Sequence, residues 1–175
     1  SGWNGPTAFT TACAPISNFS ENFDTVTTPA LPTCWSKILS GGTISTFASV
    51  NTVNFVSASA PNGVTLYNSD SEATDNIMLV TPMLTNISAG THRLKFKARN
   101  NTDSQDLEIG VLTNPTDAST FTLVQAVDIT TTFQSYVVNF DTFTGSGAVI
   151  ALRRLSTSTY TDVYLDDIVW EAMPS

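Results

Sequence analysis

Charged residues are scarce in this chain of 175 residues, and the charge that is present is mostly negative. Asp, Glu, Lys and Arg together make up 13% of the sequence, and seven basic against fifteen acidic residues give a net charge of −8. Such a chain repels a polyanion on average, so we expect no nucleic-acid partner. An acidic surface is compatible with divalent cations, although solubility alone explains it as well.

The residues that most often carry catalysis are also few, with one histidine, His92, and two cysteines. This set cannot supply the usual ligands of a zinc site. A Ser-His-Asp or Cys-His site would have to use His92, which is followed by Arg93 and shows no orienting carboxylate beside it in sequence. No glycine-rich phosphate loop follows a strand and opens a helix. We therefore expect no enzyme, although a glycosidase needs only two carboxylates and is not excluded by counting.

Long hydrophobic runs are missing, and none approaches the ~20 residues that a membrane-spanning helix needs. No signal peptide is present and the chain starts at Ser1 without methionine, so we expect a piece of a larger, exported protein. Cys13 and Cys34 enclose a proline-rich stretch and lack metal-ligand spacing. We expect a disulfide between them, which suits an oxidising extracellular compartment; a free pair is the alternative.

Helical periodicity is nearly absent, whereas segments of β-forming residues recur between turn clusters rich in Gly, Pro, Asn and Ser. Hydrophobic residues make up 41% of the chain, which is a globular composition. The pattern predicts one all-β domain, a two-sheet antiparallel β-sandwich. The expected strands are residues 18–25, 34–38, 53–56, 64–67, 76–81, 90–99, 105–112, 121–127, 133–140, 148–155 and 162–170.

The segment 92–99 alternates most clearly, with a period of two that places its basic side chains on one face. These side chains are Arg93, Lys95, Lys97 and Arg99. Together with Arg153, they could bind a sulfated or carboxylated glycan. Alternatively, they pair across a hairpin with Asp106 and Glu108 of the next segment. We favour charge pairing, because the acceptors are close in sequence and the chain is acidic overall.

Four features stand in a fixed order along the chain: SENFD at 20–24, LPTCW at 31–35, LVTPML at 79–84 followed by GTHRLKFKAR at 90–99, and VYLDDIVW at 163–170. In this order they resemble the MAM-like and cleaved-adhesin jelly-roll domains of large secreted proteins of gliding Bacteroidetes. The resemblance covers residues 13–175 and implies a jelly roll whose first and last strands adjoin. MAM domains usually carry more cysteines than this chain, so their disulfide pattern is not transferred.

The first twelve residues, SGWNGPTAFTTA, resemble the last strand of a fibronectin type III domain. This resemblance implies that such a domain precedes residue 13 in the parent protein, and that residues 1–12 are its remnant or a linker.

The jelly-roll resemblance also implies a structural calcium site, formed by Asp24 from the first strand and by Asp166 and Asp167 from the last. Such carboxylates can converge with backbone carbonyls on one Ca²⁺, which prefers oxygen ligands. Neighbours in a regular strand point to opposite faces, so we expect only one of Asp166 and Asp167 to be a ligand. Ordinary strand-end carboxylates are the alternative. A second acidic stretch, residues 68–76, lacks the glycine and final glutamate of an EF-hand loop and is expected to be a solvated loop.

Exposed aromatic side chains are the usual platforms for sugar rings. The candidates are Tyr67, Tyr136, Tyr160, Tyr164 and Trp170, whereas Phe23, Trp35 and Phe96 are expected in the core. Core packing is the alternative for each candidate. The predicted function is a non-catalytic accessory module of a secreted or cell-surface multidomain protein that binds a polysaccharide or other glycan. A protein-binding adhesin, with a cell-surface protein as partner, and a spacer between neighbouring domains are the alternatives.

Overall fold

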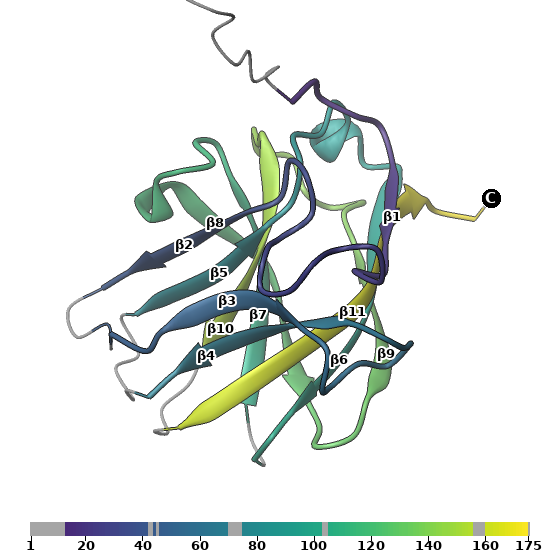
Figure 1. Ribbon diagram of the computed structural model, residues 1–175. Helices are drawn as coiled ribbons and strands as arrows, with labels where there is room; N and C mark the ends of the chain where they lie inside the picture. Colours follow the sequence, from purple (N-terminus) through teal and green to yellow (C-terminus); the bar gives the residue numbers. More distant parts are fainter. Residues whose placement is uncertain are drawn as a thin grey trace, which may run out of the picture.

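The computed structural model describes residues 13–41, 44, 46–69, 75–102, 105–155 and 160–174, with residues 105, 106 and 155 described by their backbone alone. The described part forms two packed antiparallel sheets (Figure 1). Its strands are β1 Phe19–Glu21, β2 Ser36–Ser40, β3 Ser49–Val53, β4 Gly63–Asn68, β5 Asn76–Val80, β6 His92–Asn100, β7 Gln105–Leu112, β8 Phe121–Ile129, β9 Gln134–Asn139, β10 Val149–Leu155 and β11 Thr161–Ala172. Two short 3₁₀ turns, η1 Ile87–Ala89 and η2 Ala118–Thr120, complete the set. The predicted all-β sandwich is confirmed, and no helix in these ranges is long and apolar enough to cross a membrane.

The six-stranded sheet has the order β3-β4-β11-β6-β9, and the five-stranded sheet has the order β2-β5-β10-β7-β8. The short strand β1 pairs with the end of β11, with Phe19 opposite Trp170 (Figure 1). The first and last strands therefore lie side by side, as in the jelly roll that the resemblance implied.

The core lies between the two sheets and follows the period-two pattern of the strands. In β6, Leu94, Phe96 and Ala98 are buried while the residues between them face outward. Trp35 packs edge-on against Phe23, with ring centroids 5.5 Å apart. The prediction that Phe23, Trp35 and Phe96 belong to the core is confirmed.

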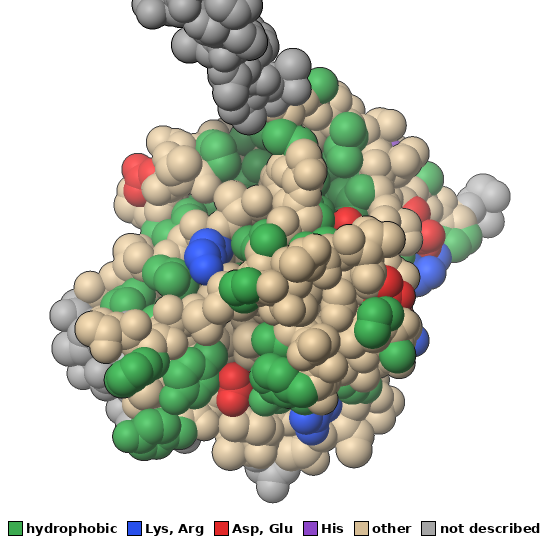
Figure 2. Space-filling model, viewed as in Figure 1, with side chains coloured by type: hydrophobic (Ala, Val, Ile, Leu, Met, Phe, Trp, Pro, Cys, Tyr) green, Lys and Arg blue, Asp and Glu red, His purple; other side chains and the backbone are tan. Residues whose placement is uncertain are grey.

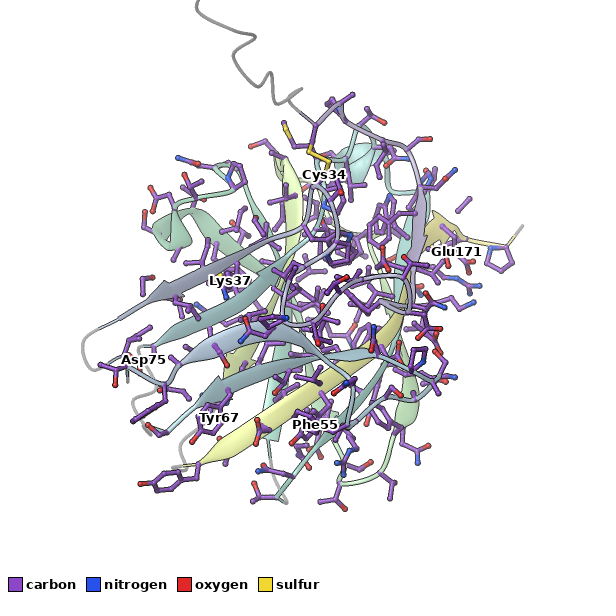
Figure 3. All side chains as sticks on the ribbon, viewed as in Figure 1. Cys34, Lys37, Phe55, Tyr67, Asp75 and Glu171 are labelled. Atoms are coloured by element: carbon purple, nitrogen blue, oxygen red, sulfur yellow. A yellow bond between two sulfur atoms is a disulfide. The ribbon has the colours of Figure 1, made fainter. Side chains whose placement is uncertain are left out.

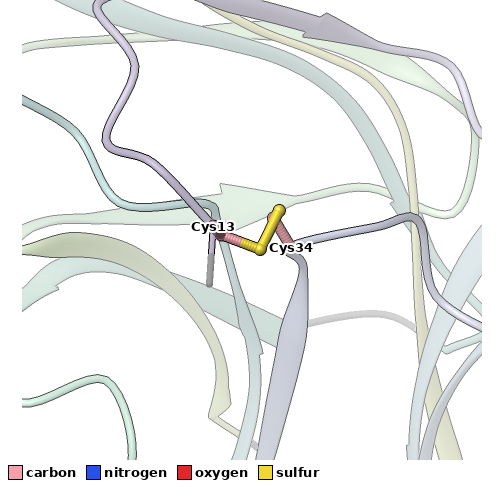
Figure 4. The surroundings of a disulfide bond; sticks show 2 residues. All are labelled: Cys13 and Cys34. Carbon is pink, nitrogen blue, oxygen red and sulfur yellow. A yellow bond between two sulfur atoms is a disulfide. The ribbon is translucent and has the colours of Figure 1, made fainter. Parts of the chain in front are cut away.

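The predicted disulfide between Cys13 and Cys34 is present, with the two Cα atoms 5.7 Å apart (Figure 4). Close to it, the backbone nitrogen of Ile16 donates to the carbonyl of Met83 at 2.9 Å. The bridge and this hydrogen bond together tie the segment before β1 to the body of the sandwich.

The expected strand at residues 53–56 is wrong, because the strand there is β3, Ser49–Val53, and the apolar residues after it lie in a loop. Residues 54–62 form this connection between β3 and β4, which we call the β3–β4 loop. Phe55, whose hydrophobicity suggested a strand, is 71% exposed in the loop. Period-two patterns cannot separate a short strand from an apolar loop of the same length.

Candidate functional site

The basic side chains of β6 lie on the outer face of the six-stranded sheet, but the expected pairing with Asp106 and Glu108 is wrong. Those acidic residues belong to β7, which follows β6 in sequence but lies in the other sheet. Arg153 is also in that other sheet and does not extend the basic face. The consecutive strands cross between sheets instead of forming a hairpin.

The strand β11 supplies the acidic partners instead. Glu171 lies 2.6 Å from Arg93 and 3.3 Å from Lys95, and Asp167 lies 2.9 Å from Lys97. These ion pairs on a partly exposed face agree with the expected charge pairing, though with different partners, and glycan binding by these three cations stays a prediction. Exposed pairs of this kind contribute little to stability.

Asp166 and Asp167 both contact the β3–β4 loop. Asp166 is fully buried, and its Oδ2 accepts hydrogen bonds from the backbone nitrogens of Ala58 at 2.7 Å and Ser59 at 2.8 Å. The hydroxyl of Ser59 donates to Oδ1 of Asp167 at 2.8 Å. The two carboxylates therefore fix the middle of this loop against β11.

The two carboxylates reach the same loop because β11 is irregular at this point. The register between β11 and β6 shifts between Asp166 and Val169, and Asp167 has a φ angle of 49°. Such a β-bulge re-aims a side chain without ending the sheet. In a regular strand Asp166 and Asp167 would point to opposite faces, and the bulge removes that restriction.

Asp24 holds the far end of the same loop. Its Oδ1 accepts from the backbone nitrogen of Asn62 at 3.1 Å, and the amide of Asn62 donates to the carbonyls of Phe23 and Val26, each at 3.0 Å. All three carboxylates that the resemblance assigned to calcium thus take part in anchoring the loop.

The surroundings of Asp166 and Asp167 shift the pKa values of these two carboxyl groups in opposite directions. Burial raises the pKa of Asp166 above its ordinary value, against the backbone hydrogen bonds from Ser59, Asp167 and Ala58. Burial also acts to raise the pKa of Asp167, but the hydrogen bonds from Lys97 and Ser59 outweigh this effect. The pKa of Asp167 is therefore below its ordinary value. The two groups are therefore held in different ways, one by backbone donors and one by a cation.

The contacts of Asp166 do not suit a calcium ligand. Its Oδ1 accepts from the backbone nitrogen of Asp167 at 2.7 Å, so both oxygens already accept from N–H donors. Within the described ranges, no group of three His, Cys, Asp or Glu side chains is close enough to hold a metal ion. The calcium site stays a prediction that these carboxylate contacts do not support. Residues 70–74 of the second acidic stretch and residues 1–12 lie outside the described residues.

The aromatic candidates are placed very differently from one another. Trp170 is fully buried, packs edge-on against Phe140 at 5.0 Å, and donates from Nε1 to Oδ1 of Asn86 at 2.9 Å. Its interpretation as an exposed sugar platform is wrong, because it points into the core. Tyr164 is also buried, whereas Tyr160 is 69% exposed, as its polar loop predicted.

A hollow of about 1050 Å³ lies on the outer face of the five-stranded sheet, and we call it the β2–β8 groove. This volume is at the upper end of the range of ligand pockets. One side is β2, and the other is the segment 115–119 that leads into β8. The lining also includes Asn76, Glu108, Phe121, Leu123 and Arg153.

The register places one wall of the groove. Across the outer face, Val80, Ala151, Gly110 and Leu123 stand in one row of paired residues. Phe121, which lines the groove, packs over Gly110 in this row. A Cβ atom at Gly110 would lie 2.3 Å from the ring of Phe121, so only glycine allows this packing.

Arg153 is held rigidly in the groove by three neighbours. Its Nε donates to Oε2 of Glu108 at 2.6 Å and its Nη1 donates to Oδ1 of Asn76 at 3.1 Å. Its guanidinium lies 4.1 Å from the ring centroid of Phe121. A guanidinium fixed in this way loses little conformational freedom when a ligand accepts a hydrogen bond from it.

The far wall of the groove is a hydrogen-bonded turn. Oδ1 of Asp117 accepts from the backbone nitrogen and the hydroxyl of Ser119, at 2.9 Å and 2.7 Å, and these bonds lower the pKa of Asp117. Four charged residues line the groove: Lys37, Arg153, Glu108 and Asp117. The ammonium of Lys37 bonds to β3 in the other sheet, so the groove itself has one cation, Arg153, which is paired with Glu108, and the carboxylate of Asp117. Polar groups stand there beside apolar ones.

The sequence alone does not reveal this site. Residues 114–117, Asn-Pro-Thr-Asp, have the composition of a turn, but a turn signal does not show which face of which sheet the turn covers. The alternation of Glu108 and Gly110 in β7 places them on one face, which was the available signal. The pairing of β10 with β7, which places Arg153 opposite Glu108 on that face, could not be predicted from the sequence.

Comparison with solved structures places this fold beside two groups of modules. The K1 cleaved adhesin domain of Lys-gingipain from Porphyromonas gingivalis matches with a TM-score of 0.69 and 18% identity, over 90% of this chain and 99% of that chain. The K2 cleaved adhesin domain of Lys-gingipain matches with a TM-score of 0.67 and 15% identity, over 89% of this chain and 98% of that chain. The CBM22-1 xylan-binding domain of Paenibacillus barcinonensis Xyn10C matches with a TM-score of 0.58 and 13% identity, over 90% of this chain and 94% of that chain.

The chain thus has the jelly-roll fold shared by cleaved adhesin domains and carbohydrate-binding modules. At these identities the likeness shows the fold alone. No protein-family model and no curated protein matches the sequence.

Proposed function

We propose that this chain is a non-catalytic glycan-binding module of a secreted or cell-surface multidomain protein, and that the β2–β8 groove is its binding site. The observation that carries the proposal is the fixed Arg153 network beside Phe121 in a groove of ligand-pocket size. Sugars present both hydroxyl groups and apolar ring faces, and such a mixed lining can contact both.

The charge balance of the groove indicates an uncharged glycan. Arg153 is compensated by Glu108, and Lys37 donates to the carbonyl of Val50 at 3.0 Å and to Oδ1 of Asn51 at 2.9 Å. No cation of the lining is therefore left to favour an anionic ligand. One solved structure with the same fold is a xylan-binding domain, and we choose xylan as the first probe.

Affinity gel electrophoresis against neutral polysaccharides tests this function. We expect xylan, or another neutral polysaccharide of a panel containing mannan and mixed-linkage β-glucan, to retard the protein. Leu123→Arg is expected to weaken that binding at least tenfold, because Leu123 is 48% exposed and lines the groove. The long cationic side chain fills the space without disturbing the core.

Val137→Arg is the matched control, because Val137 is a similarly exposed apolar strand residue, at 47%, on the outer face of the other sheet. It is expected to bind as the wild type does. A panel in which no neutral polysaccharide retards the wild-type protein contradicts the proposal, and equal losses in both variants contradict the assignment to the groove.

Protein binding is the second candidate function, and exposed apolar side chains favour it. Phe47 and Phe55 are 73% and 71% exposed, and the fold is that of the cleaved adhesin domains. The disulfide supports an oxidising, extracellular location for either function. The MAM-like relationship and the preceding fibronectin type III domain remain predictions from the sequence.

The calcium prediction is tested by thermal unfolding of the wild-type protein in EDTA and then in excess Ca²⁺. A ligand of the native state stabilises it by mass action, so a calcium site requires a lower melting temperature in EDTA and its recovery with Ca²⁺. Equal melting temperatures in the two conditions contradict the prediction.

A further inference from the structure

We propose a second ligand site on the opposite sheet, where a hollow of about 730 Å³ binds a hexuronic acid unit of an acidic polysaccharide through Arg99 and Phe55. The hollow, which we call the Arg99 hollow, lies between the β3–β4 loop and the connection from β8 to β9, residues 130–133. Its lining comes from both segments and from β6: Asn54, Phe55, Val56, Ser57, Ala60, Pro61, Arg99, Thr131, Thr132 and Phe133. It shares no lining residue with the β2–β8 groove.

Arg99 differs from the other cations of β6 in its contacts. Arg93, Lys95 and Lys97 each lie within 4 Å of a carboxylate of β11, whereas in the part of the chain that the structure describes Arg99 does not. The residue opposite Arg99 on β11 is Tyr164, not an acid. Among the basic side chains of β6, Arg99 is thus the one that we assign to an external anion.

The guanidinium of Arg99 is nevertheless held in place. It lies 4.8 Å from the ring centroid of Tyr164 and 5.7 Å from that of Phe133, and its Nη1 donates to the carbonyl of Thr131 at 3.3 Å. Stacking on aromatic faces orients the guanidinium while leaving donors in its plane for a carboxylate, which it can bind with two parallel hydrogen bonds.

Asp162, on which Arg99 acts through space, is already engaged. Its Oδ1 accepts from the hydroxyl of Thr65 at 3.0 Å and its Oδ2 accepts from the amide of Asn101 at 3.2 Å. Burial raises the pKa of Asp162, and Arg99 acts in the opposite direction through space. Asp162 therefore influences Arg99 without forming an ion pair with it.

Phe55 supplies the apolar contact that a sugar ring needs. It is 71% exposed and lies over the six-stranded sheet beside β11 in Figure 3. The hydroxyl-bearing residues Ser57, Thr131 and Thr132 also line the hollow. A hexuronic acid combines a ring face, hydroxyl groups and one carboxylate, which matches an aromatic ring, polar side chains and a guanidinium that forms no ion pair with the carboxylates that the structure describes.

The loop that carries Phe55 is fixed by the carboxylates described above. Asp166 accepts from Ala58 and Ser59, and the carbonyl of Val56 lies 2.8 Å from where a Cβ atom of Gly63 would be. Only glycine allows this close return of the loop. The wall of the Arg99 hollow is therefore organised before a ligand arrives, which lowers the entropic cost of binding.

Isothermal titration calorimetry of the full chain with trigalacturonic acid at low salt tests the proposal, and the methyl-esterified trisaccharide is the uncharged comparison. We expect the acid to bind and the ester to bind at least tenfold more weakly. Arg99→Gln is expected to reduce binding of the acid at least tenfold, because it removes the charge-assisted hydrogen bonds. Phe55→Ala is expected to weaken the binding of both trisaccharides.

Arg93→Gln is the matched control, because it removes the same charge from the same strand at a residue already paired with Glu171. It is expected to leave binding of the acid unchanged, and so is Leu123→Arg in the β2–β8 groove. No binding of trigalacturonic acid, or equal losses in Arg99→Gln and Arg93→Gln, overturns the proposal. The probes and the decisive variants differ from those used for the β2–β8 groove. One of the two proposals can therefore be contradicted while the other holds.

Discussion

Replacement of Trp170 by alanine is expected to lower the free energy of unfolding by roughly 3–5 kcal/mol, the usual cost of emptying a buried aromatic site. The side chain is fully buried between the sheets, packs against Phe140, and donates a hydrogen bond to Asn86 that alanine cannot make. For a chain of this length, the loss corresponds to a fall in melting temperature of roughly 6–20 °C. Thermal unfolding followed by circular dichroism measures it.

Trp170→Phe separates packing from a role in binding. It keeps an aromatic ring against Phe140 and loses the hydrogen bond to Asn86, so we expect a smaller fall in melting temperature and unchanged glycan binding by the folded protein. A Trp170→Ala protein that melts like the wild type but no longer binds glycan would contradict the core assignment and restore Trp170 as a sugar platform.

Replacement of Asp166 by alanine is expected to cost roughly 3 kcal/mol, which corresponds to a fall of roughly 6–12 °C in melting temperature. The substitution removes the acceptor of the backbone nitrogens of Ala58, Ser59 and Asp167 and leaves these donors without a partner. We also expect the β3–β4 loop to loosen, which hydrogen exchange of the Ala58 and Ser59 amides detects.

Asp128→Ala is the control for loss of an aspartate from a strand, since Asp128 is exposed on β8. Its melting temperature is expected to stay within about 2 °C of the wild type, as for most surface substitutions. Asp166→Asn keeps one acceptor oxygen but brings an NH₂ group toward backbone N–H donors. We therefore expect its melting temperature to lie between those of the wild type and Asp166→Ala. Equal melting temperatures for Asp166→Ala and Asp128→Ala contradict the anchoring role.

The sandwich could be predicted because its strands follow local rules. The alternation of apolar and basic residues in β6 identified both the strand and its buried face, and the turn clusters separated most strands correctly. Strand boundaries were wrong where backbone geometry decides. The strand β1 ends at Glu21, four residues before the expected end at residue 25, and Phe23 just beyond it has a φ angle of 61°. The pattern of apolar and polar residues does not indicate where a residue other than glycine adopts the left-handed backbone conformation.

The site was harder to predict because it depends on which strands become neighbours. The cations of β6 were assigned to acids of β7, the next strand in sequence, but the chain crosses to the other sheet and β11 provides Glu171 and Asp167. The same long-range pairing leaves Arg99 opposite Tyr164 and brings Arg153 beside Glu108. Neither arrangement has a signal within a short window of sequence.

On the face shown in Figure 2, charged side chains are few, and acidic and basic ones lie together at its right edge. Each of the two proposed sites depends on an individual arginine placed by packing. Arg153 is compensated and stacks on Phe121, and Arg99 stacks on Tyr164 without an acidic partner among the described residues. This difference is why we assign a neutral ligand to one hollow and an acidic ligand to the other.

The proposal that the β2–β8 groove binds a glycan is tested most directly by titrating the ¹⁵N-labelled protein with a xylo-oligosaccharide, or with an oligosaccharide of whichever neutral polysaccharide retards it. The shifted amide signals are then mapped on the structure. We predict saturable shifts concentrated in β2 (Ser36–Ser40), in η2 (Ala118–Thr120) and around Arg153. Saturable shifts confined to the six-stranded sheet, or no shifts with any neutral oligosaccharide, would contradict a binding site on the five-stranded sheet.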